Sequence, residues 1–157
     1  MRVLAFDQST TVTGWAIING GDYEKSGRID LSNNHDLENR LQHMMMIISG
    51  MITAVKPDLV IIEDVQNQTN NATFKTLSQL QGAIMHMCYA NETRLSKIAP
   101  TSWRKKLGFR QGQKIRRQYL KEQSIDFVRK YCGKTVKDDE ADAICIGVSA
   151  FYNKSTE

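Results

Sequence analysis

The sequence predicts a single α/β domain, and three observations carry this prediction. Apolar runs of strand length alternate with longer segments of helical periodicity, in the order β-β-β-α-β-α-β-α-α-α. The first three strands are joined by short turns, which indicates an antiparallel meander. A chain of 157 residues has the length of one domain, and its two prolines and ten glycines form no linker-like stretch. We therefore expect one domain over residues 1–157.

Five segments have the composition of strands, with apolar and β-branched residues between turn residues. The second and third are separated by Gly20-Gly21, a pair that favours a tight hairpin turn. The fourth, DLVIIE, is apolar on both faces, as expected for a strand inside a sheet. The predicted strands are Arg2–Gln8, Val12–Asn19, Asp22–Asp30, Asp58–Glu63 and Thr93–Ala99.

Five other segments have helical signals. In the first of them apolar residues recur every three or four positions, and Asn34 is the expected N-cap. Lys56-Pro57 ends this helix, whereas Pro100 suits the first turn of the third. The predicted helices are His35–Val55, Asn71–Ala90, Pro100–Trp103, Gln113–Tyr131 and Asp138–Phe151, with Gly108–Gly112 as a loop.

Charge is distributed unevenly along the chain. The net charge of +4 combines −2 over residues 1–99, +10 over residues 100–137 and −4 over residues 138–157. A solvated helical face is the ordinary explanation of a basic segment. Twelve Lys and Arg against two acids exceed what solubility requires, so this segment favours contact with a polyphosphate such as nucleic acid.

Four acidic residues are candidates for a metal-binding active site. Asp7 and Glu63 each lie at the end of an apolar strand, where an unpartnered charge is costly. Asp139 and Asp142 are three residues apart, so a helix places them on one face, and the alanines beside them let that helix approach a sheet. If the first and fourth strands are neighbours, all four carboxylates converge.

Converging carboxylates repel one another unless cations lie among them. Carboxylate oxygens suit Mg²⁺ or Mn²⁺ rather than zinc. Two such ions can activate a water and stabilise the leaving oxygen of a phosphodiester. We therefore expect two Mg²⁺ ions, for which Mn²⁺ can substitute, and no small-molecule cofactor.

Each acid also has a simpler explanation when it is taken alone. Asp7 can cap a turn, Glu63 can pair with a lysine, and the acids that begin the last helix can stabilise its N-terminus. Their combination with the basic segment favours the metal site.

Four segments carry a resemblance to a known family: FDQSTTVTGWAII, LVIIEDV, residues Ala72 to Ala83, and DDEADAICIG. In this order and spacing they resemble the motif regions of RuvC-type Holliday-junction resolvases, most closely the bacteriophage members from lactococcal phages. The last motif is the most specific of the four. The first motif taken alone also resembles the phosphate loop of sugar kinases.

The resemblance implies an RNase H-like fold, with a five-stranded mixed sheet and helices on both faces. It implies a homodimer that cuts four-way DNA junctions by paired nicks, with the helix Asn71–Ala90 in the interface. It carries Asp7, Glu63, Asp139 and Asp142 over as the catalytic and metal-binding residues. The family has two basic residues beside these acids. The first corresponds here to Arg104, with Lys105 as the alternative, and the second to Lys114.

The chain departs from the family pattern at two positions. Gln8 replaces a proline that often follows the first aspartate of bacterial members. Gln66 replaces an aromatic residue that wedges into the junction, and it is followed by the polar run NQTNN. A glutamine is too small to fill a base-sized gap, so we expect weak sequence specificity and activity on three-way junctions as well.

The expected DNA surface combines basic residues with nearby polar and aromatic ones. Trp103 and Phe109 lie among the basic residues, where they either stack on bases or anchor a loop to the core. Asn67, Gln68, Asn70 and Asn71 can contact bases or phosphates. The residues expected to bind DNA are Arg104, Lys105, Lys106, Arg110, Lys114, Arg116, Arg117, Lys121 and Gln66.

Three classes of function fit the sequence to different degrees. A metal-dependent endonuclease that cuts branched DNA fits best. A fragment of an actin-like kinase or ATPase lacks a second domain and a second phosphate loop, and a non-catalytic DNA-binding module does not explain four intact acids. The N-terminus does not have the pattern of a secretory signal, no run suits a membrane span, and three scattered cysteines favour a reducing cytoplasm, that of the host cell if a phage encodes the protein.

Overall fold

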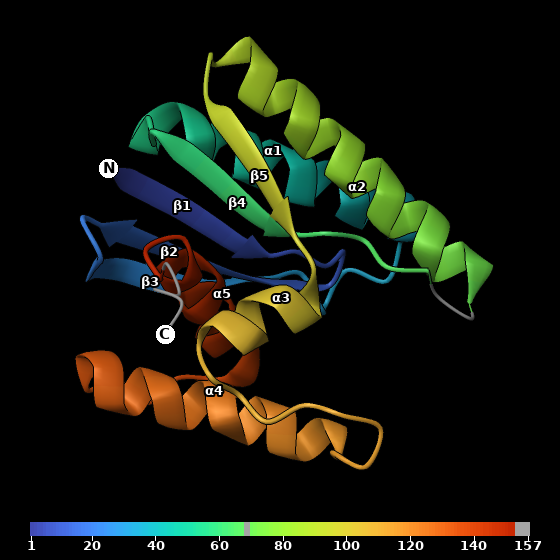
Figure 1. Ribbon diagram of the computed structural model, residues 1–157. Coiled ribbons are helices and arrows are strands. Elements are labelled where there is room, and N and C mark those ends of the chain that lie inside the picture. Colours follow the sequence, from blue (N-terminus) through green and yellow to red (C-terminus); the bar gives the residue numbers. More distant parts are fainter. Residues whose placement is uncertain (68–69, 153–157) are drawn as a thin grey trace.

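The computed structural model describes residues 1–67 and 70–152. Its strands form one mixed sheet in the order β3-β2-β1-β4-β5 (Figure 1). β1, β2 and β3 are antiparallel, whereas β4 runs parallel to β1 and β5 runs parallel to β4. The carboxyl ends of β1, β4 and β5 therefore lie at one edge. The strands are β1 Arg2–Asp7, β2 Val12–Asn19, β3 Asp22–Asp30, β4 Leu59–Glu63 and β5 Arg94–Ile98.

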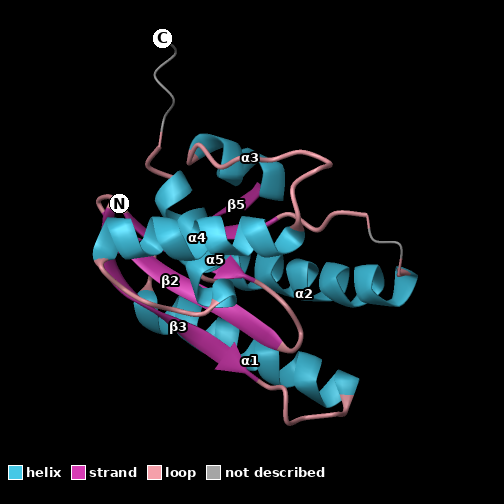
Figure 2. Cartoon of the chain, turned by 90° about the horizontal axis from the view of Figure 1, so that it is seen from below, coloured by secondary structure: helices cyan, strands magenta, loops and turns pink. Residues whose placement is uncertain are grey.

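Helices cover both faces of the sheet. α1 and α2 pack together on one face, while α5 lies on the other, over β1, β2 and β3. Seen from below, α4 lies outside α5, so this side is two helices deep (Figure 2). α3 follows β5 and contacts α5. The helices are α1 Leu37–Val55, α2 Asn71–Ala90, α3 Pro100–Lys106, α4 Arg117–Cys132 and α5 Asp138–Ser149.

Two apolar clusters, one on each side of the sheet, form the core. On the α5 side the helix lies very close to the strands, because glycines remove side chains at two contact points. A Cβ added at Gly14 would lie 1.9 Å from the carbonyl oxygen of Asp139, and one at Gly147 would lie 2.8 Å from Cγ1 of Ile18. This close approach brings the first turn of α5 down onto β1 and β2.

Most predicted elements agree with the structure, and the differences have local causes. α1 begins at Leu37, because Asp36, and not Asn34, accepts the capping hydrogen bond from the backbone N–H of Asn39 at 2.8 Å. α3 continues three residues beyond Trp103 to Lys106. α4 begins only at Arg117, since the chain is still extended at Arg116. Among the described residues, no helix is long and apolar enough to cross a membrane.

Candidate active site

Two of the four predicted acids lie side by side because of the sheet topology. β1 and β4 are hydrogen-bonded neighbours, with Phe6 opposite Ile62. Asp7 and Glu63 follow these two residues, so both carboxylates project at the same edge of the sheet. The predicted pairing of the first and fourth strands is therefore confirmed.

α5 adds the other two acids from above the sheet. Asp7, Gly14 and Arg28 occupy one row across β1, β2 and β3, so they face the same side. Gly14 has no side chain, and the backbone of Asp139 fills that space. Asp139 therefore lies over the row whose two ends are Asp7 and Arg28. One helical turn further, Asp142 faces the same region.

Asp7 and Asp142 carry negative charges that nearby positive groups do not fully compensate. Burial, followed by repulsion from Asp142, Glu63 and Asp139, raises the pKa of Asp7 well above its usual value, although Arg104 opposes this shift. Burial raises the pKa of Asp142 to about 6, although the Ser124 hydroxyl and Arg104 lower it. Oδ1 of Asp142 is buried without a hydrogen-bond partner. These two acids are therefore suited to a nearby cation.

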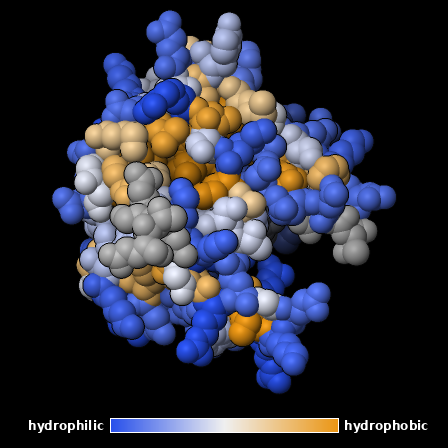
Figure 3. Space-filling model, viewed as in Figure 1, coloured by the Kyte–Doolittle hydropathy of each residue, from blue (hydrophilic) through white to orange (hydrophobic). Residues whose placement is uncertain are grey.

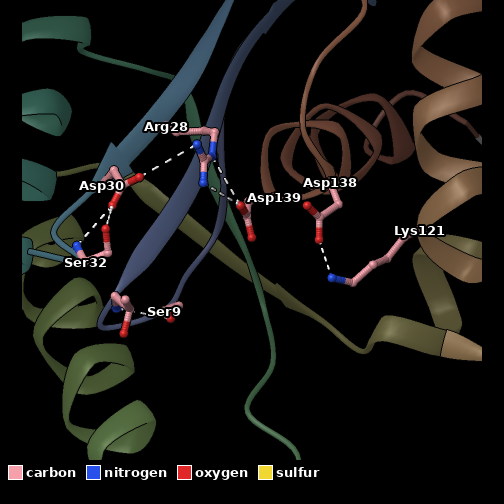
Figure 4. A network of polar contacts seen from close by, with 8 residues as sticks. Ser9, Arg28, Asp30, Ser32, Lys121, Asp138 and Asp139 are labelled. Carbon is pink, nitrogen blue, oxygen red and sulfur yellow. Dashed lines mark hydrogen bonds and ion pairs between the residues drawn. The ribbon is translucent and has the colours of Figure 1, made fainter. Parts of the chain in front are cut away.

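The acids in the first turn of α5 have partners instead, and Figure 4 shows those of Asp138 and Asp139. The Arg28 guanidinium contacts Oδ2 of Asp139 through Nε and Nη2, both at 3.2 Å. Lys121 of α4 pairs with Asp138. Ser26 donates a hydrogen bond of 2.6 Å to Oε1 of Glu140. Two elements, β3 and α4, thus hold three consecutive acids, and Arg28 is a site residue that sequence reasoning missed.

Glu63 has a neutral partner. Nε1–H of Trp103 donates a hydrogen bond of 2.9 Å to Oε2 of Glu63. Burial raises the pKa of Glu63, whereas this hydrogen bond and Arg104 lower it. Trp103 is fully buried and makes an edge contact with Phe109. The alternative in which Trp103 stacks on DNA bases is therefore wrong, because its ring is buried in the core.

A polar cavity of about 590 Å³ opens beside the acids. Asp7 and Asp139 lie on its wall, together with the Gln8–Val12 loop, and Thr73 and Thr76 of α2 face them. Arg117 from the start of α4 completes the lining. The space-filling view shows the molecule hollowed between its α4 and α2 sides, with hydrophilic side chains along the hollow (Figure 3).

The basic residues predicted to bind DNA lie in different surroundings. Arg104 is half-buried and its guanidinium lies 4.7 Å from the centroid of the Trp103 ring. Lys106 donates to the carbonyl of Ser149 at 3.3 Å, and Lys121 is occupied by Asp138. The remaining five are exposed on the surface and begin α4 or precede it: Lys105, Arg110, Lys114, Arg116 and Arg117.

The polar segment after β4 is described only in part. Gln66 is exposed, and its side-chain amide donates to the carbonyl of Asp64 at 3.2 Å. Asn70 is the N-cap of α2 and accepts from the backbone N–H groups of Ala72 and Thr73. Gln68 lies outside the described residues.

The described side chains do not form a ready-made metal site. No three His, Cys, Asp or Glu side chains in residues 1–67 and 70–152 are grouped closely enough to hold one ion. Arg28 holds one oxygen of Asp139, and Trp103 holds one oxygen of Glu63. The arrangement is a partly open cluster of carboxylates at the wall of a polar cavity.

Sequence comparisons identify similar proteins over nearly the whole chain. A family model described as "Crossover junction endodeoxyribonuclease RuvC" matches residues 3–150. A protein of that description from Dictyoglomus thermophilum is 26% identical over 159 residues, covering 98% of both chains. Another from Orientia tsutsugamushi (strain Boryong) is 28% identical over 159 residues, covering 98% of this chain and 97% of the relative.

Structural comparisons agree with the fold. "T. thermophilus RuvC in complex with Holliday junction substrate" matches with a TM-score of 0.78 at 16% identity, covering 97% of this chain and 94% of that chain. "Crystal structure of Fowlpox virus resolvase and substrate Holliday junction DNA complex" matches with a TM-score of 0.66 at 20% identity, covering 96% of each chain. The predicted RNase H-like fold, a five-stranded mixed sheet with helices on both faces, is confirmed.

Proposed function

The chain belongs to the RuvC family of crossover junction endodeoxyribonucleases, and on this premise we propose that it resolves Holliday junctions by hydrolysing phosphodiester bonds. The observation that supports this function in the chain's own structure is the position of α5. Its close packing on Gly14 places Asp139 and Asp142 against the strand ends that carry Asp7 and Glu63.

Nucleases of this family depend on metal ions, and the four acids fit such ions by charge and by chemistry. The unpartnered buried Oδ1 of Asp142 and the raised pKa of Asp7 both indicate carboxylates that lack a cation. We assign Asp7, Glu63, Asp139 and Asp142 as ligands of two Mg²⁺ ions, which Mn²⁺ can replace. These carboxylates must turn toward one another to share an ion.

The metal ions, when bound, activate a water and stabilise the leaving oxygen of the phosphodiester. The chain's own residues hold the substrate. Arg104 lies close enough to the acids to lower the pKa of Asp7, Glu63 and Asp142, and its charge is suited to a phosphate group at the same place. Arg117 on the cavity wall is suited to the DNA backbone leading away from it.

Recognition of the branched shape rests on phosphate contacts, which carry no sequence information. The proposed surface contains the basic residues of α3, of the following loop and of α4, and of its exposed members Arg117 lines the cavity. Gln66 is exposed but has only a short polar end. We therefore keep the prediction of weak sequence specificity and of cleavage at several sites around four-way and three-way junctions.

A homodimer matches the two symmetric strands of a junction. α2 exposes apolar side chains that support a partner there: Phe74 is 36% exposed, Met85 44% and Tyr89 84%. Ile84 of the same helix is instead buried in the chain's own core. A DNA substrate supports the expected cytoplasmic location. The bacteriophage origin stays a prediction, because the relatives named above come from bacteria.

A nicking assay tests the function. Wild-type protein and Asp142→Asn are incubated with synthetic four-way, three-way and linear DNA, with Mg²⁺ or with a chelator. We expect paired nicks in the branched substrates, only with the wild type and only with the metal. Metal-independent binding without cleavage by the wild type would instead identify a non-catalytic DNA-binding module.

A further inference from the structure

The buried indole of Trp103 touches two parts of the active site at once, and we propose that it is a positioning residue for both. Its Nε1–H donates to Oε2 of Glu63 at 2.9 Å. Its ring lies against the guanidinium of Arg104, with Cζ 4.7 Å from the ring centroid. Trp103 thus ties a proposed metal ligand to the adjacent arginine, an inference that rests on the proposed function.

The contact with Glu63 fixes a side chain that the strand alone leaves free. Glu63 ends β4, and its three side-chain torsions are not set by the sheet. Trp103 is 0% exposed and packs edge-on against Phe109, with ring centroids 5.8 Å apart, so its own orientation is fixed. A buried indole N–H requires an acceptor, and here the acceptor is Oε2 of Glu63. Among the described residues, the other oxygen of Glu63 has no hydrogen-bond donor.

The donor is neutral, which matters for a metal ligand. Asp139 is held by a guanidinium that also offsets its charge. Glu63, by contrast, forms no ion pair within the described part of the chain, so the indole orients the carboxylate and leaves its negative charge for a cation. A lysine or arginine at position 103 would compete with that cation.

The contact with Arg104 holds a guanidinium that has no anionic partner. Within residues 1–67 and 70–152, Arg104 forms no ion pair, and its Nε is buried without a hydrogen bond. The face of the Trp103 ring is therefore the contact that places it, as expected for a cation–π pair. The Nη1 and Nη2 donors of Arg104, which form no hydrogen bond among the described residues, remain available for a phosphate beside the acids.

Two substitutions separate these contacts. Trp103→Phe keeps an aromatic ring for Arg104 and for the core but removes the N–H, whereas Trp103→Leu removes both. Trp15→Phe is the matched control, since Trp15 packs with the apolar cluster on the opposite face of the sheet. Three quantities are measured for each: the Mg²⁺ concentration that half-saturates the protein without DNA, from isothermal titration calorimetry, and kcat and KM on a four-way junction.

We expect Trp103→Phe to raise the half-saturating Mg²⁺ concentration about tenfold and to lower kcat about tenfold, with KM unchanged. Trp103→Leu should lower kcat about a hundredfold and also raise KM, because Arg104 loses its support. Trp15→Phe should match the wild type in all three quantities.

A measurement on the wild-type protein guards against variants that fold poorly. The two indole N–H resonances are assigned from the Trp15→Phe and Trp103→Phe spectra, or from either one alone. Adding Mg²⁺ should move the Trp103 resonance and leave that of Trp15 in place. An unmoved Trp103 resonance, or an unchanged Mg²⁺ midpoint in folded Trp103→Phe, overturns the inference while wild-type cleavage keeps the proposed function. A wild type that neither binds Mg²⁺ nor cuts junctions overturns the proposed function itself.

Discussion

The acids around the active-site edge form two groups with opposite surroundings. The inner group lies at the strand ends and one turn into α5, and none of its members has a cation within 4.0 Å among the described residues: Asp7, Glu63 and Asp142. The outer group begins α5, and each of its members is held by a different side chain: Asp138, Asp139 and Glu140. Neighbouring carboxylates thus differ in whether the fold itself supplies their partner.

The outer acids therefore stabilise the fold, whereas the inner acids destabilise it. The outer group fastens the first turn of α5 to α4 and β3, and it benefits from the N-terminal end of the helix. The inner group is partly buried and mutually repulsive, which destabilises the metal-free protein. Asp139 belongs to both by position, because Arg28 holds one of its oxygens while it also repels Asp7.

The largest contrast should appear in cleavage when one acid of each group is changed to its amide. Asp142→Asn removes a proposed ligand charge, and cleavage should fall at least about a thousandfold, since about 4 kcal/mol of charge stabilisation is lost. Asp138→Asn, one turn earlier in the same helix, should cut within about twofold of the wild type. Initial nicking rates on one four-way junction measure both. Normal cutting by Asp139→Asn together with inactive Asp138→Asn would shift the assignment by one residue.

The second contrast concerns stability without metal. Asp7→Asn removes a repelled charge, so in a chelator at pH 8 the melting temperature should rise by about 2–6 °C. The folded pKa of Asp7 lies above the unfolded value, so the wild type loses stability as pH rises above about 4. The gain from the substitution should therefore shrink toward zero at pH 4. Melting curves at four pH values test this, and an equal gain at every pH would contradict the charge explanation.

The third contrast concerns the contribution of Arg28, the partner of an outer-group acid, to stability. Arg28→Gln removes the partner of Asp139, and the side chains of this pair are only 20% and 29% exposed. We expect a loss of about 1 kcal/mol in the free energy of unfolding. A double-mutant cycle with Asp139→Asn isolates the pair. Arg129→Gln, whose pair with Asp126 is 56% and 61% exposed, is the control and should show no coupling.

The smallest effect should come from Lys121 and Asp138. The hydrogen bond from Lys121 lowers the pKa of Asp138, so this pair stabilises the fold above about pH 4 and the stabilisation is lost as pH falls through the folded value. Both side chains are about a third exposed, which limits the contribution to about 0.3–1 kcal/mol. Urea unfolding of Asp138→Asn at pH 7 and pH 3 measures it. A larger loss at pH 3 would reverse the sign and contradict the pairing.

Sequence patterns predicted the strands and α2 closely, because strong apolar periodicity and turn residues act locally. β2, β3 and α2 have the predicted bounds. The pairing of the first and fourth strands was a condition for convergence of the acids, and the parallel register confirms it. Asp7 and Glu63 could be identified because charges at the ends of apolar strands are conspicuous in a sequence.

Arg28 could not be predicted, because its place depends on an irregularity in the hairpin. Asn19 pairs with Asp22, but the register shifts between Ile17 and Ile18, so that Gly14 faces Arg28. A regular hairpin from the same turn would put Gly27 opposite Gly14 and turn Arg28 to the other face of the sheet. A shift of one residue that no local pattern signals therefore decides whether this arginine reaches the acids.

Two glycines, one in β2 and one in α5, determine how closely the helix packs on the sheet at its two ends. Gly14 of β2 lies beneath the first turn of α5, whereas Gly147 belongs to the last turn of α5 and faces the side chains of Ile18 and Ala5. Two contacts along one rod fix its tilt as well as its height. A methyl group at either glycine lifts only the nearby end of α5. Gly14→Ala therefore raises Asp139 from the sheet, whereas Gly147→Ala lifts the C-terminal end and tilts the helix about its first turn. The alignment of the acids thus depends on two missing side chains, one on the sheet and one on the helix.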